Sequence, residues 1–134
     1  MKLKRDLEMI PPQGVMVDQE ETQTLLDLIK LNGHLDDLIS VARSASGDLI
    51  DEVVFLDPED ALGVLRKFLS GDISTQELSK WAEFVYFLDT IGVAEEHQDV
   101  LIQFLFEIST PELFFEVNRE TCLRWVSRLR QEIG

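Results

Sequence analysis

The sequence predicts an all-α, single-domain bundle of six or seven helices joined by short loops. Apolar residues recur at three- and four-residue spacings along most of the chain, capping signals precede several of these stretches, and no two strong strand-like runs occur. A chain of 134 residues with 45% hydrophobic content can bury one sizeable core. Residues 1–17 contain two prolines and a glycine near their middle and are expected to form a loose arm, with residues 18–134 forming the helical domain.

The first two helices are expected on either side of a break at Asn32-Gly33. Asp18 and Glu21 have the spacing of a capping box, which predicts a helix start at Asp18. After the break, a second apolar face consists of Leu35, Leu38, Ile39 and Ala42.

The segment Ile50–Leu56 is ambiguous between a short strand and a buried connector. No second strong strand run is available to pair with it, so a connector is the favoured interpretation. Asp57 followed by Pro58 then predicts an N-cap and a proline in the first helical turn, where its missing N–H is harmless. This helix is expected to end at Gly71.

Ser74 and Glu77 form a second capping box, which is expected to open the longest helix of the chain. From Phe84 to Leu88 this helix is apolar nearly all round, which is typical of a central helix wrapped by others. Gly92 is expected to end it.

Two further helices are expected in the C-terminal part of the chain, on either side of a short turn at Thr110-Pro111. The first covers roughly Glu95–Ile108, and Asn118 is expected to cap the second. The face of the last helix is the clearest amphipathic stripe in the sequence and consists of Cys122, Trp125, Val126, Leu129 and Ile133.

The chain is strongly acidic, with 26 acidic against 12 basic residues and a formal net charge of −14. From Trp81 to Asn118 it contains no Lys or Arg, whereas the last helix is basic and carries Arg124 and Arg128, which we expect to pair with acids of neighbouring helices. This balance argues against direct binding to nucleic acid or to an anionic membrane, and it favours a positively charged partner.

No residue pattern indicates catalysis, a metal site or a cofactor site. His34 is expected to face solvent, His97 lies within an acidic first helical turn, and Cys122 lies on an apolar helix face, where a buried structural thiol is the expected role. We therefore expect a non-enzymatic protein without metal or cofactor.

The N-terminal segment is basic, but it is interrupted by acids and is not followed by an apolar run, so it does not predict a signal peptide. A single cysteine is typical of a reducing compartment. These observations predict a soluble cytoplasmic protein.

The candidate partner-binding residues are acids of the base-poor stretches together with two adjacent phenylalanines. Four phenylalanines fall between residues 104 and 115, and any that is exposed beside the acids would be an aromatic anchor within a charged rim. The predicted partner-binding set is Asp48, Asp51, Glu52, Asp57, Glu59, Asp60, Glu95, Glu96, Asp99, Phe114 and Phe115.

An acidic, all-helical domain of this size without catalytic residues resembles the immunity proteins of bacterial toxin systems, including contact-dependent growth inhibition and nuclease colicins. The likeness spans residues 18–134 in size, charge and helicity, and the turn Leu69–Ser74 with the helix that follows it looks like a pattern in small bacterial proteins. Nuclease-colicin immunity proteins are shorter and carry paired tyrosines, whereas this chain has only Tyr86.

The resemblance implies an inhibitor that neutralises a basic toxin or nuclease. A helical adaptor or regulatory subunit that binds another protein through a Phe-rich surface is the alternative. A ligand pocket lined by Trp81, Tyr86 and Trp125 would indicate a third class, a small-ligand-binding or enzymatic domain.

Overall fold

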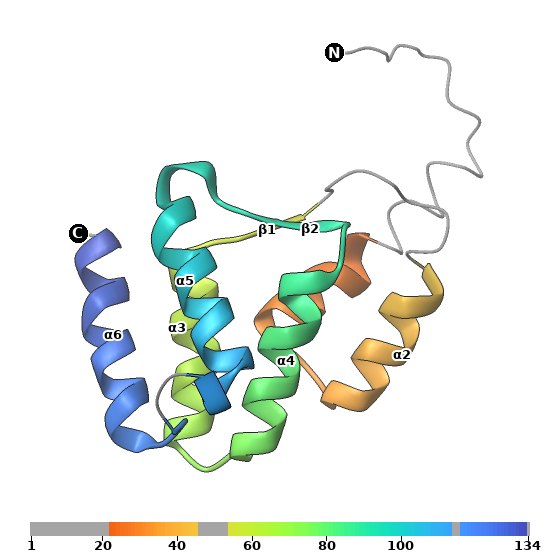
Figure 1. Ribbon diagram of the computed structural model, residues 1–134. Coiled ribbons are helices and arrows are strands. Elements are labelled where there is room, and N and C mark those ends of the chain that lie inside the picture. The colour runs from red at the N-terminus through yellow and green to blue at the C-terminus, as the bar shows by residue number, and fades with distance from the viewer. Residues whose placement is uncertain (1–21, 46–53, 114–115, 134) are drawn as a thin grey trace.

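The structure is a computed structural model, shown in Figure 1, and it describes residues 22–45, 54–113 and 116–133. It is predominantly helical, with a single small sheet among the described residues, and the predicted all-α bundle is confirmed. The predicted arm at residues 1–17 and the predicted cap at Asp18 lie outside the described residues.

The elements follow one another with short connections. A first helix covers residues 22–30 and precedes the labelled elements. The labelled elements are α2 (Leu35–Ala45), β1 (Val54–Leu56), α3 (Pro58–Leu69), α4 (Thr75–Phe87), β2 (Ile91–Val93), the 3-10 turn η3 (Glu95–His97), α5 (Gln98–Ser109), the 3-10 turn η4 (Pro111–Leu113) and α6 (Arg119–Ile133).

Three predicted helix starts in the described part of the chain are confirmed by their capping bonds, whereas the helix expected from about Glu95 begins at Gln98, after a 3-10 turn. The Asp57 side chain accepts a hydrogen bond from the Asp60 backbone N–H at 2.8 Å. Ser74 and Glu77 make the reciprocal bonds of a capping box at the start of α4. At α6, the Asn118 Oδ1 accepts a hydrogen bond from the Thr121 N–H at 2.9 Å. Side chains at these positions satisfy backbone N–H groups that a helix start leaves free.

The connector predicted for Ile50–Leu56 is wrong for its described part. Residues 54–56 form β1, which pairs in parallel with β2, and Phe55 lies opposite Gly92 in the register. Parallel strands need a long crossover, which here consists of α3 and α4, so the partner strand lies far away in the sequence. Ile91 was expected to belong to the preceding helix and Gly92 to end it, so the second strand was not predicted.

The prediction for the helix after Ser74 is also wrong in its length. α4 ends at Phe87, and Leu88 already has an extended backbone, so α4 has 13 residues against 15 in α6. Phe87, on its second apolar face, is not wrapped by other helices, since this residue is 67% exposed. The end of α4 is therefore a surface element.

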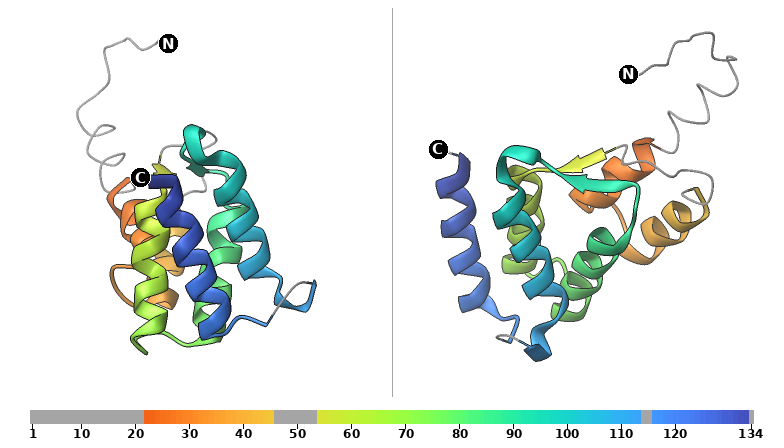
Figure 2. Two further views of the ribbon diagram at one scale, coloured as in Figure 1. Left: turned by 90° about the vertical axis from the view of Figure 1, so that its left-hand side faces the viewer. Right: turned by 45° about the horizontal axis from the view of Figure 1, so that its top comes forward.

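The bundle is built mainly from two helix pairs, α3 with α6 and α4 with α5, and Figure 2 shows both pairs side by side. The predicted faces supply most of the core, whereas Ile133 is exposed at the end of α6. The buried Trp81 indole donates a hydrogen bond to the Leu28 carbonyl at 2.8 Å, which ties α4 to the first helix. The largest buried side chains include Trp81, Phe104, Leu28, Leu65, Leu101 and Leu105.

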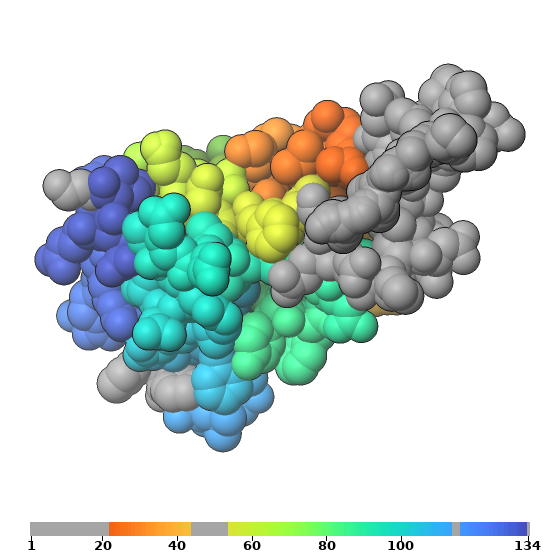
Figure 3. Space-filling view, turned by 90° about the horizontal axis from the view of Figure 1, so that it is seen from above, coloured from red at the N-terminus to blue at the C-terminus, as the bar shows by residue number. Residues whose placement is uncertain are grey.

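The parallel sheet brings two helix starts together. Leu56 and Val93 are opposite each other, and each is followed within a few residues by a helical turn. The Ala94 N–H donates to the Leu56 carbonyl at 2.8 Å, which fixes this edge. The first turns of α3 and of η3–α5 therefore start beside each other, and we call this part of the molecule the sheet end. Figure 3 looks onto it, with β1 in yellow beside the teal start of α5.

Candidate partner-binding surface

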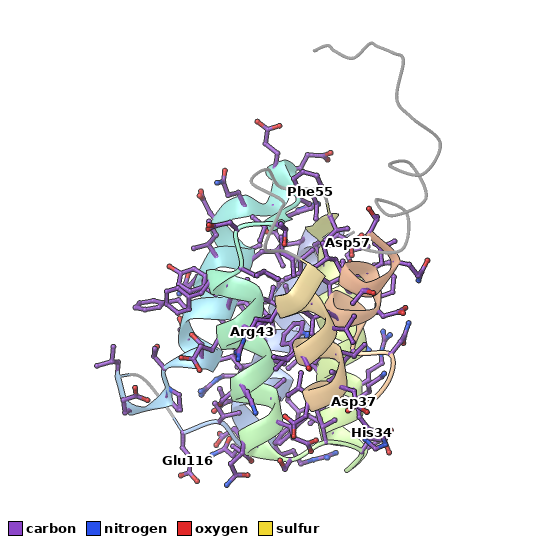
Figure 4. All side chains as sticks on the ribbon, turned by 90° about the vertical axis from the view of Figure 1, so that its right-hand side faces the viewer. His34, Asp37, Arg43, Phe55, Asp57 and Glu116 are labelled. Atoms are coloured by element: carbon purple, nitrogen blue, oxygen red, sulfur yellow. The ribbon has the colours of Figure 1, made fainter. Side chains whose placement is uncertain are left out.

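The sheet end gathers most of the described acids of the predicted partner-binding set. Glu59 lies in the first turn of α3, Glu95 and Glu96 lie in η3, and Asp99 lies in the first turn of α5, and all four are exposed. Asp57 is exposed and caps α3 at the same end, close to Phe55 in Figure 4. Acids from two distant parts of the sequence thus form one surface, at helix starts where negative charge is favourable.

Asp60 has a different position from the other predicted acids. It is only 8% exposed, and its Oδ1 accepts a hydrogen bond from the Lys30 Nζ at 2.6 Å. Burial raises the pKa of the Asp60 carboxyl, and the Lys30 ammonium opposes that rise. The hydrogen bond to Asp60 in turn raises the pKa of Lys30. Asp60 therefore joins α3 to the first helix and is not part of the exposed acidic surface.

Five residues of the predicted set lie outside the described residues, so the structure gives them no position. They are Asp48, Asp51, Glu52, Phe114 and Phe115.

A cluster of aromatic rings lies on the surface where α4 and α5 meet. The ring centroid of Tyr86 is 4.9 Å from that of Phe87 and 6.0 Å from that of Phe106, which is 37% exposed. We call these three residues the surface aromatic cluster. Phe55 of β1, which is 51% exposed, lines one cavity together with Tyr86, so the cluster continues to the sheet end.

The aromatic cluster was only partly predicted. Phe106 belongs to the four phenylalanines that the sequence groups near the acids, but Phe55 and Phe87 were assigned to a connector and to a wrapped helix. The available signal was the apolar circumference of the helix at residues 84–88, because a helix cannot bury all sides when its neighbours cover only one of them. The sequence alone does not show which side is left open.

The cysteine and the two histidines, which were considered as catalytic or metal-binding candidates, lie on different elements of the fold. The Cys122 thiol is buried, and burial raises its pKa to about 11, which disfavours the nucleophilic thiolate. The His97 Nδ1 lies 2.8 Å from the Glu132 Oε1 and connects η3 to the end of α6. His34 is exposed near the opposite end of the molecule (Figure 4). No group of three His, Cys, Asp or Glu able to hold a metal ion occurs within the described residues.

The tryptophans do not form the pocket that would indicate a ligand-binding domain. Trp81 and Trp125 are both buried, and each ring packs edge-to-face against Phe104. Tyr86 faces a different, surface cavity.

Arg128 was expected to pair with an acid of a neighbouring helix. Instead, its guanidinium donates a hydrogen bond to the Gln103 side chain at 3.1 Å and lies 4.9 Å from the Trp125 ring centroid.

Comparisons with known proteins do not assign the chain to a family. No family model, no curated protein and no solved structure matches it. None of the helices in the described ranges is long and apolar enough to cross a membrane. The surface described above therefore carries the functional argument: exposed acids at the sheet end, continuous with exposed aromatic rings.

Proposed function

We propose that this chain is a non-enzymatic protein-binding domain whose sheet end binds a basic protein. The observation that carries the proposal is the exposed aromatic cluster beside acids from two helix starts, on a chain with net charge −14. Aromatic residues at the centre of an interface supply most of its binding energy, and charge on the rim mainly sets the rate of encounter. The sheet end has both exposed aromatic rings and exposed acids.

We further propose that the partner is a basic toxin or nuclease and that the chain is its immunity-type inhibitor. Nucleases bind phosphate backbones and so present basic clefts, and ordered carboxylates compete for such a cleft. The exposed acids Glu59, Glu95, Glu96 and Asp99 supply carboxylates at one end of the molecule. Inhibition then follows from occupying the cleft, without chemistry on the part of this chain.

The test begins with affinity capture from lysate of the source cells at low and high salt. The expected result is a basic protein that is retained at low salt and weakened at high salt, with a nuclease or toxic activity that falls as the chain is added. An acidic or neutral protein held equally at both salt concentrations would contradict the proposal.

The captured protein then allows a test of the sheet end itself. The double variant Glu59→Lys with Glu96→Lys should slow association roughly ten-fold or more at low salt and flatten its salt dependence. The matched control is Asp72→Lys with Glu116→Lys, which makes the same change of charge at the opposite end, where Figure 4 places Glu116. Equal slowing by both variants would mean that net charge acts without a defined surface.

A helical adaptor is the second candidate function, and the exposure of Phe87 favours it. This side chain is 67% exposed and packs against Tyr86, so it presents apolar area that needs no charge on the partner. An adaptor would lose binding on Phe87→Ser and keep its binding in high salt. An inhibitor that depends on charge would lose binding both on Phe87→Ser and in high salt.

A further inference from the structure

A cavity of about 390 Å³ lies between the sheet, the end of α4 and the start of α5. Phe55 and Tyr86 are its aromatic walls, Ile102 is an aliphatic wall, and Glu95 and Gln98 are its polar lining side chains. It adjoins the surface aromatic cluster through Tyr86, so it lies within the surface proposed to bind a protein.

The register of the sheet explains why there is space at this point. Phe55 is opposite Gly92, and paired residues project from the same face of a sheet. Val54 and Leu56, on the other face, are buried against the core, whereas Phe55 is exposed. Gly92 therefore lines the cavity beside Phe55 without adding a side chain to it.

The lining determines which chemistry the cavity accepts. Among the described residues that line it, Glu95 carries the only formal charge at neutral pH. The faces of aromatic rings attract cations, and a guanidinium both stacks on such rings and binds carboxylates. An aliphatic stem followed by a planar cation therefore fits this combination of apolar walls and polar groups better than a purely apolar side chain.

We propose that this cavity receives an arginine side chain of the partner, with its guanidinium against the aromatic walls Phe55 and Tyr86 and beside the Glu95 carboxylate. This inference rests on the proposed function, since it names the side chain that the sheet end recognises. Arginine is enriched among the residues that dominate binding energy at protein interfaces.

The direct test is a nuclear magnetic resonance titration of the full chain with N-acetyl-arginine amide. The expected result is a set of shifts at Phe55, Tyr86, Gly92 and Ile102. The neutral and nearly isosteric probe N-acetyl-citrulline amide should produce weaker shifts or none. Equal shifts with both probes, or arginine shifts elsewhere on the surface, would overturn the inference.

Two variants separate the cavity from the rest of the surface. Gly92→Val puts a strand-favouring side chain into the cavity and should abolish the arginine shifts. Glu95→Gln removes the charge without changing the size of the side chain, and it should weaken arginine binding about two- to five-fold, as expected for an exposed ion pair. Glu95→Gln is informative even if Gly92→Val fails to fold. Unchanged arginine binding in Glu95→Gln would contradict the proposed role of the carboxylate.

The captured partner distinguishes failure of this inference from failure of the proposed function. If Glu59→Lys with Glu96→Lys slows association but Gly92→Val leaves partner affinity unchanged, the sheet end binds the partner and the cavity does not hold its arginine. If neither variant affects association, the proposed function fails as well.

Discussion

Two aromatic trios share α4 and α5 and differ in their surroundings. In the buried trio, the Phe104 ring lies 6.3 Å from Trp81 and 5.3 Å from Trp125. The surface aromatic cluster has similar ring separations, 4.9 Å and 6.0 Å, and yet Phe87 is 67% exposed. Contact between rings therefore does not by itself define a core. What distinguishes the buried trio is that a third helix, α6, covers it through Trp125.

The residues of the buried trio stabilise the fold, whereas the residues of the surface aromatic cluster remain accessible to a partner. Phe104 and Phe106 are two positions apart on α5 and project from different sides of the helix, one into the core and one toward Tyr86 at the surface. A buried aromatic side chain stabilises the fold because most of its apolar area is removed from water. A side chain that stays exposed stabilises the fold much less. The same residue type thus lies in the core on one side of α5 and at the surface on the other.

The largest expected effect is on the buried trio. Phe104→Ala should lower the free energy of unfolding by about 3–5 kcal/mol, because it leaves a cavity between Trp81 and Trp125. Urea denaturation of the full chain measures this, with Phe106→Ala as the matched control on the same helix. A loss in Phe106→Ala as large as that in Phe104→Ala would remove the distinction between the two trios.

A second, smaller effect concerns Cys122, on the same helix as Trp125. Because burial raises its pKa to about 11 from an ordinary value of 9.0, the neutral thiol contributes stability that is fully present below pH 9 and lost as the pH rises through 11. The wild type should therefore lose about 2 kcal/mol more than Cys122→Ala between pH 8 and pH 11.5. Denaturation at both pH values measures the difference, and parallel losses in the two proteins would contradict a buried thiol.

The smallest expected effect is on the surface aromatic cluster. Phe87→Ser should change the free energy of unfolding by less than about 0.5 kcal/mol, because the side chain is already largely exposed. The same variant should weaken capture of the partner, which a purely structural residue would not do. A stability loss above about 2 kcal/mol would instead place Phe87 among the residues that hold the fold together.

The sequence predicts this fold where its signals are local. The caps at Asp57, Ser74 and Asn118 and the three- and four-residue spacings define the helices, because both depend on residues within a turn or two. The strand pair escaped prediction because its register depends on residues at 54–56 and 91–93, which only the packing of α3 and α4 brings together. A three-residue strand carries too little pattern to be recognised without its partner.

The candidate surface was predictable in its charge and not in its shape. Glu59, Glu95, Glu96 and Asp99 are acidic in any fold, but their gathering at one end follows from the parallel register. The role of Asp60 could not be predicted, because Lys30 reaches it from another helix. Nor could the exposure of Phe55 and Phe87, since a hydrophobic pattern marks an apolar face without showing what covers it.

The pairing of β1 with β2 also has a consequence for when the sheet end forms during folding. The two strands can meet only after the intervening α3–α4 hairpin has closed, so this contact is non-local and costs loop entropy until the helices have formed. The sheet end, with its acids and its cavity, exists only in a chain that has passed this step. A partner that recognises it would therefore read a conformational epitope, one that neither a nascent chain stopped before Ile91 nor an unfolded chain presents.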